Sequence, residues 1–162
     1  MSTVLTAMLC ASFAGLGSVT NLFSRGEELT VASRRCDMDR KSGIVLFEGA
    51  ARVDYRPGYT LLADRVFAIF SGTNELDRIV AAGDVTVTNE SRVAVCDRAV
   101  FTRRMGELEI RGWPDGRPAR LTDESGNSVA GSRMKFWLDA SQVEVFDSEL
   151  TFDKGGRSVK GL

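Results

Sequence analysis

The side chains that most often do chemistry in proteins are scarce in this sequence. Its 162 residues include no histidine, so the commonest general base and the commonest metal ligand are both missing. A serine–histidine–aspartate triad is therefore excluded. Neither a Gly-x-Ser-x-Gly turn nor a phosphate-binding Gly-rich loop is present. We predict that the protein has no catalytic residues, uses no cofactor and is not an enzyme.

The remaining polar residues do not form a metal or nucleic-acid site. Asp37, Asp39 and Asp97 could suggest a calcium site, but their number and spacing fit no calcium-binding loop, and we predict no metal. Lysines and arginines number 21 against 22 acidic residues, and the two signs are interspersed along the chain. A nucleic-acid-binding surface needs a basic face. The composition therefore predicts no nucleic-acid partner.

A short pattern recurs along the chain: a small residue, then Ser or Asp, then Arg. It occurs at Ala32–Arg34, Ala63–Arg65, Cys96–Arg98 and Gly131–Arg133. The arginines lie 31, 33 and 35 residues apart, a period typical of proteins in which similar supersecondary units stack on one another. These arginines could form a basic row for an anionic ligand, or they could point outward and pair with acidic residues of neighbouring units. We favour the second interpretation.

The three cysteines do not form a disulfide framework. Cys10 lies in the apolar N-terminal stretch. Cys36 and Cys96 could pair in an oxidising compartment, but they occupy different positions of the repeat. The other three repeats have alanine or glycine at the position of Cys96, which favours a role for it as a small buried residue.

Between the occurrences of this pattern, β-branched and polar residues alternate with a period of two. Such alternation is typical of half-buried strands. No window after Leu29 has the pattern of an amphipathic helix. Gly49, Gly83 and Gly112 follow or interrupt strands and indicate bends. The expected strands are Leu29–Cys36, Ile44–Glu48, Thr60–Phe70, Arg78–Thr88, Arg92–Phe101, Glu107–Arg111, Ser128–Leu138 and Gln142–Phe146. The sequence therefore predicts an all-β fold of stacked antiparallel strands.

The N-terminal segment has the character of an export signal. Residues 1–24 carry no charged side chain, and Val4–Val19 is apolar, rich in small residues and short for a membrane-spanning helix. Ser12–Ala14 is a small-x-small cleavage site, although no Lys or Arg precedes the apolar run. We predict a signal peptide or a retained membrane anchor over 1–24, a folded domain over 29–152 and a flexible tail over 153–162.

Two of the repeat units resemble those of the OstA-like family. Val31–Asp39 followed by Gly43–Gly49 resembles the family's opening repeat, and Leu62–Arg65 followed by Ile79–Val87 resembles the next one. This family contains the periplasmic lipopolysaccharide-transport proteins LptA and LptC and the N-terminal domain of LptD. The resemblance covers residues 29–152, which is nearly all of the expected mature chain.

The resemblance implies a twisted β-jellyroll with a V-shaped cross-section, whose apolar groove shields the acyl chains of lipopolysaccharide. It implies a periplasmic location, in a bridge that carries lipopolysaccharide from the inner to the outer membrane. The implied partners are lipopolysaccharide, other Lpt-type jellyroll proteins joined through edge strands, and further copies of the chain end to end. Two alternatives stay open: a membrane-anchored LptC-like component of the transporter, and a self-assembling structural β-solenoid with no lipid ligand.

Apolar residues at alternating strand positions are the candidates for the lipid-binding wall of the groove. A slip of one residue in register would reverse every side chain, so the alternation alone does not say which face points inward. We expect Val85→Glu to weaken acyl-chain binding with little loss of fold. The candidates are Val45, Phe47, Val85, Val87, Val93, Val95, Leu108, Ile110, Phe136, Val143 and Val145.

Overall fold

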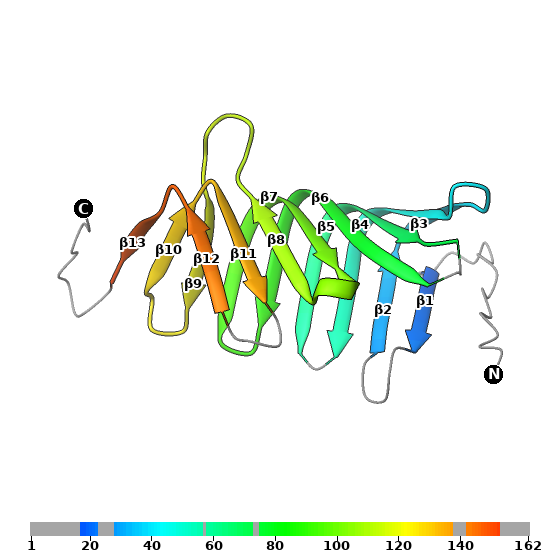
Figure 1. Ribbon diagram of the computed structural model, residues 1–162, viewed down its shortest axis with the longest axis horizontal. Helices are drawn as coiled ribbons and strands as arrows, with labels where there is room; N and C mark the ends of the chain where they lie inside the picture. Colours follow the sequence, from blue (N-terminus) through cyan, green and yellow to red (C-terminus); the bar gives the residue numbers. More distant parts are fainter. Residues whose placement is uncertain (1–16, 23–27, 57, 73–74, 138–141, 153–162) are drawn as a thin grey trace.

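The computed structural model describes residues 17–22, 28–56, 58–72, 75–137 and 142–152. Over these residues the chain forms one continuous antiparallel sheet of thirteen strands and one turn of 3-10 helix, η1 (Arg103–Met105) (Figure 1). The predicted all-β fold is confirmed. The strands are β1 (Gly17–Leu22), β2 (Glu28–Ser33), β3 (Arg35–Asp39), β4 (Ile44–Arg56), β5 (Tyr59–Phe70), β6 (Leu76–Asn89), β7 (Arg92–Thr102), β8 (Glu107–Arg111), β9 (Ala119–Asp123), β10 (Ser128–Gly131), β11 (Arg133–Trp137), β12 (Gln142–Phe146) and β13 (Glu149–Thr151).

The strands cross a corner that divides the sheet into two arms. At this corner the pairing register shifts after Glu48 in β4 and after Ala82 in β6. Gly49 and Gly83 follow, with φ angles of 81° and 85°, and the next residue in each strand also has a positive φ. Left-handed backbone within a bulge bends a strand sharply, and glycine adopts it without steric cost. The bends predicted at these two glycines are confirmed.

Each arm is a continuous ladder of strands or half-strands. The first arm consists of β1, β2, the second half of β4, the first half of β5, the second half of β6, the first half of β7, then β9, β10 and β13. The second arm consists of β3, the first half of β4, the second half of β5, the first half of β6, the second half of β7, then β8, β11 and β12. The long strands β4 to β7 therefore belong to both arms and join them (Figure 1).

Two of the predicted strands are each divided into two at the corner. The expected strand Leu29–Cys36 breaks at Arg34, whose N–H donates to the carbonyl of Gly49 at 3.0 Å. The expected strand Ser128–Leu138 breaks at Ser132, whose N–H donates to the carbonyl of Phe146 at 3.0 Å. These two bonds give the backbone N–H groups at the breaks a partner where the chain turns from one arm to the other.

The recurring pattern of a small residue, Ser or Asp, and Arg lies at the corner in every unit. In the first unit, the residues at the structurally equivalent positions begin one residue later than the sequence pattern does. Ala63, Cys96 and Gly131 are buried, and the two residues after each point away from the core. In the first unit the fully buried small residue is the serine of Ser33–Arg35, so this stretch, and not Ala32–Arg34, is the structural equivalent. Sequence comparison missed the shift because Ser and Ala both satisfy a small-residue pattern.

The predictions for the two ends of the chain concern residues that lie mostly outside the described part. Within residues 1–24, only Gly17–Leu22 is described, as strand β1 paired antiparallel with β2. Residues 1–16 and the predicted tail 153–162 lie outside the described residues, so the signal peptide, the anchor and the tail stay predictions. Among the residues that are described, no helix is both long enough and apolar enough to span a bilayer.

Candidate functional site

The inward-facing side chains of the two arms form the walls of a groove. We call the inward residues next to the corner the deep layer. They are at most 6% exposed, and those of the first arm are mostly small, which lets the arms approach closely at the corner. The deep layer consists of Ala51, Ala63, Val85, Cys96 and Ala119 in the first arm and Phe47, Val66, Ala81, Ala99, Ile110 and Met134 in the second.

We call the inward residues farther from the corner the mouth layer. It is apolar like the deep layer, but Tyr55, Tyr59, Phe101, Leu121 and Phe136 are only partly buried. Partly buried aromatic and aliphatic side chains at the opening of a groove are a surface that an apolar ligand can contact. The mouth layer includes Leu29, Val31, Val53, Tyr55, Tyr59, Leu61, Val87, Ala94 and Leu121 in the first arm and Val45, Ala68, Ile79, Phe101, Leu108, Phe136 and Val143 in the second.

Two small cavities lie between inward residues of the two arms, and a more open pocket of about 170 Å³ adjoins the second of them at Arg92 and Leu121. The first cavity, of about 50 Å³, is lined by apolar and aromatic residues that include Leu61 from the first arm and Ile79 from the second. The second cavity, of about 60 Å³, has Arg92 and Asn89 among its otherwise mostly apolar lining. Val87, Tyr59 and Leu108 line both cavities, so the two lie next to each other along the groove.

Aromatic rings close the groove at its mouth. The ring of Tyr55, at the end of β4 in the first arm, lies 5.6 Å from the ring of Phe101 in the second arm, centroid to centroid. Tyr55 also lies 6.5 Å from Tyr59, its cross-strand partner in β5. Tilted ring pairs at these separations are mutually attractive. The contact between Tyr55 and Phe101 therefore joins the arms across the opening.

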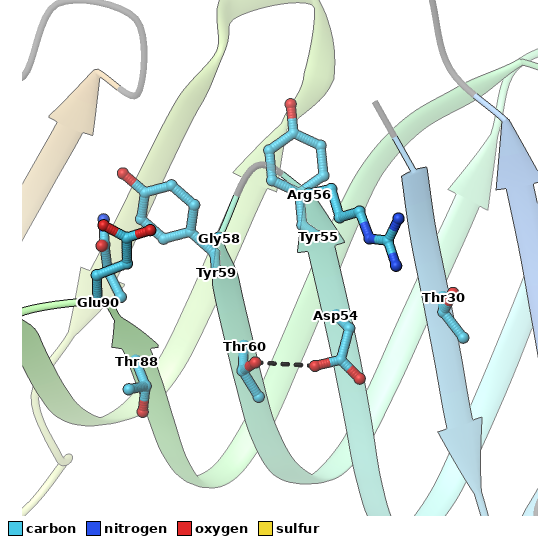
Figure 2. Close-up of a pocket in the computed structure, with 10 residues that line it drawn as sticks. Thr30, Asp54, Tyr55, Arg56, Gly58, Tyr59, Thr60, Thr88 and Glu90 are labelled. Carbon is cyan, nitrogen blue, oxygen red and sulfur yellow. Dashed lines mark hydrogen bonds between the residues drawn. The ribbon is translucent and has the colours of Figure 1, made fainter. Parts of the chain in front are cut away.

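A larger, open and polar pocket of about 620 Å³ lies at the rim of the first arm, where β4 turns into β5 (Figure 2). Asp54 is its best-connected residue: it accepts from Arg52 Nε at 2.7 Å and from Thr60 Oγ1 at 2.8 Å. The bond from Arg52 holds the pKa of Asp54 below its ordinary value. Tyr55 and Tyr59 line both this pocket and the first cavity. A polar surface thus adjoins the apolar groove at the two tyrosines.

Most of the predicted wall residues face the interior. Val87, Leu108 and Phe136 are the ones that line the cavities, while Phe47 and Ile110 belong to the deep layer. The inward set is Val45, Phe47, Val85, Val87, Leu108 and Ile110, which are buried, and Phe136, Val143 and Val145, which are half-buried. Their role in lipid binding stays a prediction.

The inward placement predicted for Val93 and Val95 is wrong. Their side chains are 42% and 38% exposed on the outer face of β7, and Ala94 and Cys96 point inward in their place. The prediction assumed that the bulky branched residues of a strand face the core. Here the small residues do, because the interior is narrow and large side chains of the second arm already fill it.

Several groove residues were missed by the sequence analysis. Tyr55 and Tyr59 flank the turn between β4 and β5, and Phe101 and Leu121 lie on β7 and β9. The signal was present in the alternation of Ala51, Val53 and Tyr55 with charged residues, but Gly49 was interpreted as the end of its strand. Ala119 and Leu121 alternate in the same way after the loop that contains Pro118. Strands β1, β9 and β13 were not predicted at all.

The residues considered for chemistry have structural partners. Asp37 pairs with Arg35 at 2.8 Å, and Asp39 accepts from Ser42 Oγ at 2.8 Å. Cys36 and Cys96, both in the described part, form no disulfide with each other. Burial raises the pKa of the Cys96 thiol to about 12, so it is protonated at neutral pH.

The arginines of the repeat lie on the outside, as the favoured interpretation requires, but among the described residues Arg65 and Arg98 form no salt bridge with an acidic residue. Arg65 and Arg98 are exposed. Arg133 lies over the ring of Phe146, with its guanidinium carbon 3.9 Å from the ring centroid. A cation over an aromatic face is attracted to it and covers apolar surface.

The open, curled antiparallel sheet is the jellyroll-like fold of LptA-type proteins. The chain is similar to LptH, solved by crystallography as the LptA-homologous periplasmic component of the lipopolysaccharide transport device from Pseudomonas aeruginosa. The two superpose with a TM-score of 0.62 over 83% of this chain and 94% of that chain, at 12% sequence identity. No family model matches the sequence, and no curated protein matches it. The likeness establishes the fold, and the function must be argued from the residues of the groove.

Proposed function

We propose that the protein is a periplasmic lipopolysaccharide-binding component of the LptA type, in which the groove between the arms shields acyl chains from water. The observation that carries the proposal is the apolar mouth layer, which is contributed by both arms of a fold shared with a lipopolysaccharide-transport protein. The proposal includes membership of the OstA-like family and a periplasmic location.

The physical requirement for such a carrier is a continuous apolar surface. Each methylene group moved out of water contributes about 0.8 kcal/mol, so an acyl chain crossing an aqueous space is strongly favoured to lie in an apolar groove. The mouth layer offers valines, leucines and aromatic rings on both sides, and the first cavity has no polar side chain other than the tyrosine hydroxyls in its lining. Lipid transfer through such a groove needs no catalytic residue.

The ends of the sheet support assembly with other jellyroll proteins. Among the described strands, β1 and β3 at one end and β12 and β13 at the other each pair on one side only. Unpaired strand edges can add a strand from another chain. We propose that other Lpt-type proteins, or further copies of this chain, dock at these edges.

The N-terminal segment separates the LptA-like proposal from an LptC-like one. Cleavage after Ala14 would release the apolar run before β1 and leave Gly17–Leu22 to cover the edge of β2. Retention would leave an anchor. N-terminal sequencing of the protein recovered from a periplasmic extract distinguishes the two: a new N-terminus near residue 15 supports the LptA-like form, and an intact Met1 in the membrane fraction supports the LptC-like form.

Site-specific photocrosslinking tests the function directly. A benzophenone amino acid at Phe136 is expected to crosslink lipopolysaccharide, because this side chain lines the second cavity. The same amino acid at Val95, which lies 38% exposed on the outer face, is the matched control and is expected to give no crosslink. Crosslinking at Val95 equal to or stronger than that at Phe136 would contradict the groove as the acyl-chain site, and no crosslink at either position would favour the structural β-solenoid.

A further inference from the structure

We infer that an acyl chain enters the groove between Tyr55 and Phe101 and replaces the contact between their rings. We call this pair the aromatic clasp. The inference rests on the proposed function and goes beyond it, because it identifies where the groove opens and which side chains control the opening. The clasp joins opposite arms, with 5.6 Å between the ring centroids.

The part of the groove behind Tyr55 and Phe101 is too full to hold a whole acyl chain. The two cavities there measure about 50 and 60 Å³, and each has room for only a few water molecules. An acyl chain is far larger than either cavity. Binding therefore requires side chains of the two arms to move apart, and the form observed is the closed one.

The position of the opening follows from the difference between the two layers. The deep layer includes Phe47 and Ile110, which are 1% and 0% exposed, and none of its residues lines either of the two cavities. In contrast, Tyr55 and Phe101 are partly buried and line the first cavity. Their ring contact therefore has partly exposed side chains on one side and a cavity on the other.

The neighbours of the clasp suit an amphiphilic ligand. Tyr59 packs against Tyr55 and lines both cavities, so a chain that passes the clasp reaches both of them. Tyr55 and Tyr59 also line the polar pocket at the rim (Figure 2). Tyrosine combines an apolar ring with a hydroxyl group that can stay hydrated. The chain would lie on the rings, and the polar part of the ligand would stay at the rim.

A reversible bridge across the clasp tests the inference. The native cysteines are replaced, with Cys96→Ala following the alanine found at the same position in the second repeat. The Tyr55→Cys and Phe101→Cys thiols are then joined by a short bis-methanethiosulfonate reagent, which forms a disulfide with each cysteine by displacing methanesulfinate. The association rate constant of cis-parinaric acid, a fluorescent fatty acid, is measured by stopped flow, and binding of lipopolysaccharide is measured by competition.

We expect the bridge to lower the association rate constant at least tenfold and reductant to restore it, which also shows that the variant is folded. Phe101→Ala should raise the rate constant about two- to tenfold, as expected from loss of one ring–ring contact. A matched bridge between Thr86→Cys and Val95→Cys, which are direct cross-strand partners on the outer face, should have no effect.

Each outcome has a distinct meaning. Uptake by the bridged protein at the unbridged rate would overturn the clasp and leave the proposed function standing. Failure of the protein with native Tyr55 and Phe101 to bind either cis-parinaric acid or lipopolysaccharide would overturn the proposed function and the clasp together.

Discussion

The deep layer and the mouth layer of the groove are both apolar, yet they are built for different purposes. In the deep layer, small residues such as Ala51 and Ala63 face large ones such as Phe47 and Ile110, and all are almost completely buried. In the mouth layer, larger side chains including Phe101 remain partly exposed and enclose cavities.

Under the proposed function, the two layers divide stability and ligand binding between two parts of one sheet. Close packing next to the corner fixes the angle between the arms, since buried residues in contact on all sides contribute most to stability. Looser packing at the mouth leaves apolar surface that a ligand can cover. Substitutions in the deep layer should therefore change stability, and those in the mouth layer should change binding.

The largest effect is expected from a charge in the deep layer. Val85 is 1% exposed, so Val85→Glu would bury a carboxylate without a partner and destabilise the protein by about 4 kcal/mol or more. This revises the sequence-based expectation that the variant keeps its fold. Urea denaturation measures the change, and Thr88→Glu, on the outer face of the same strand, is the control. Equal unfolding midpoints for the two variants would contradict the assignment of Val85 to the deep layer.

A smaller loss of stability is expected from a substitution at the corner. Gly83 has a φ of 85°, and a Cβ atom there would lie 3.0 Å from the Cβ of Asp64. Gly83→Ala should cost about 1–3 kcal/mol, because alanine rarely adopts this backbone conformation. Gly83→Asn should cost less, since asparagine tolerates it better.

The control for the corner is Gly72→Ala. Gly72 has no positive φ, and a Cβ atom there would have no neighbour within 4 Å. This substitution should change the unfolding free energy by no more than about 1 kcal/mol, because alanine fits here without strain and restricts the unfolded chain. If Gly72→Ala lowered the unfolding free energy as much as Gly83→Ala, the backbone conformation at the corner would not require glycine.

The deep layer should also make stability depend on pH. Burial raises the pKa of Cys96 from 9.0 to about 12, so the folded protein holds this proton more tightly than the unfolded chain. Its contribution to stability is complete below pH 9 and is lost as the pH rises toward 12, with a slope of up to about 1.4 kcal/mol per pH unit. Cys96→Ala should remove this part of the dependence when denaturation is measured between pH 8 and 11. An unchanged slope would show that the thiol is not buried.

The sequence predicted the strands of the fold better than it predicted the corner. Alternation over Ile44–Glu48 and Glu107–Arg111 identified strands correctly, because a half-buried strand must alternate. Gly49 and Gly83 were correctly interpreted as bends. Whether a strand continues beyond such a bend depends on its pairing with neighbouring strands. The local sequence does not contain information about this pairing. For this reason the second half of β4, with Tyr55, was missed.

The groove residues were predictable only where the large side chains of a strand point toward the interior. Leu108 and Phe136 are large and point inward, as expected. At Val93 and Val95 the bulky residues point outward, and the inward positions between them are small. The width of the interior determines which residues of the strand point inward. This width depends on both arms together. Similarly, the clasp between Tyr55 and Phe101 depends on two strands that are distant in sequence.

The smallest effect is expected from Val95→Glu, which differs from Val85→Glu only in position. Val85 and Val95 are the same residue type on adjacent strands, but Val95 is 38% exposed and faces Arg120 across the ladder. A glutamate there stays hydrated and opposite a positive charge, so the unfolding free energy should change by less than about 0.5 kcal/mol. Binding of cis-parinaric acid should be unchanged as well, because the side chain lies outside the groove. If Val95→Glu instead abolished binding without unfolding the protein, the outer face of the first arm would be the ligand surface, and the division between the deep layer and the mouth layer would lose its functional meaning.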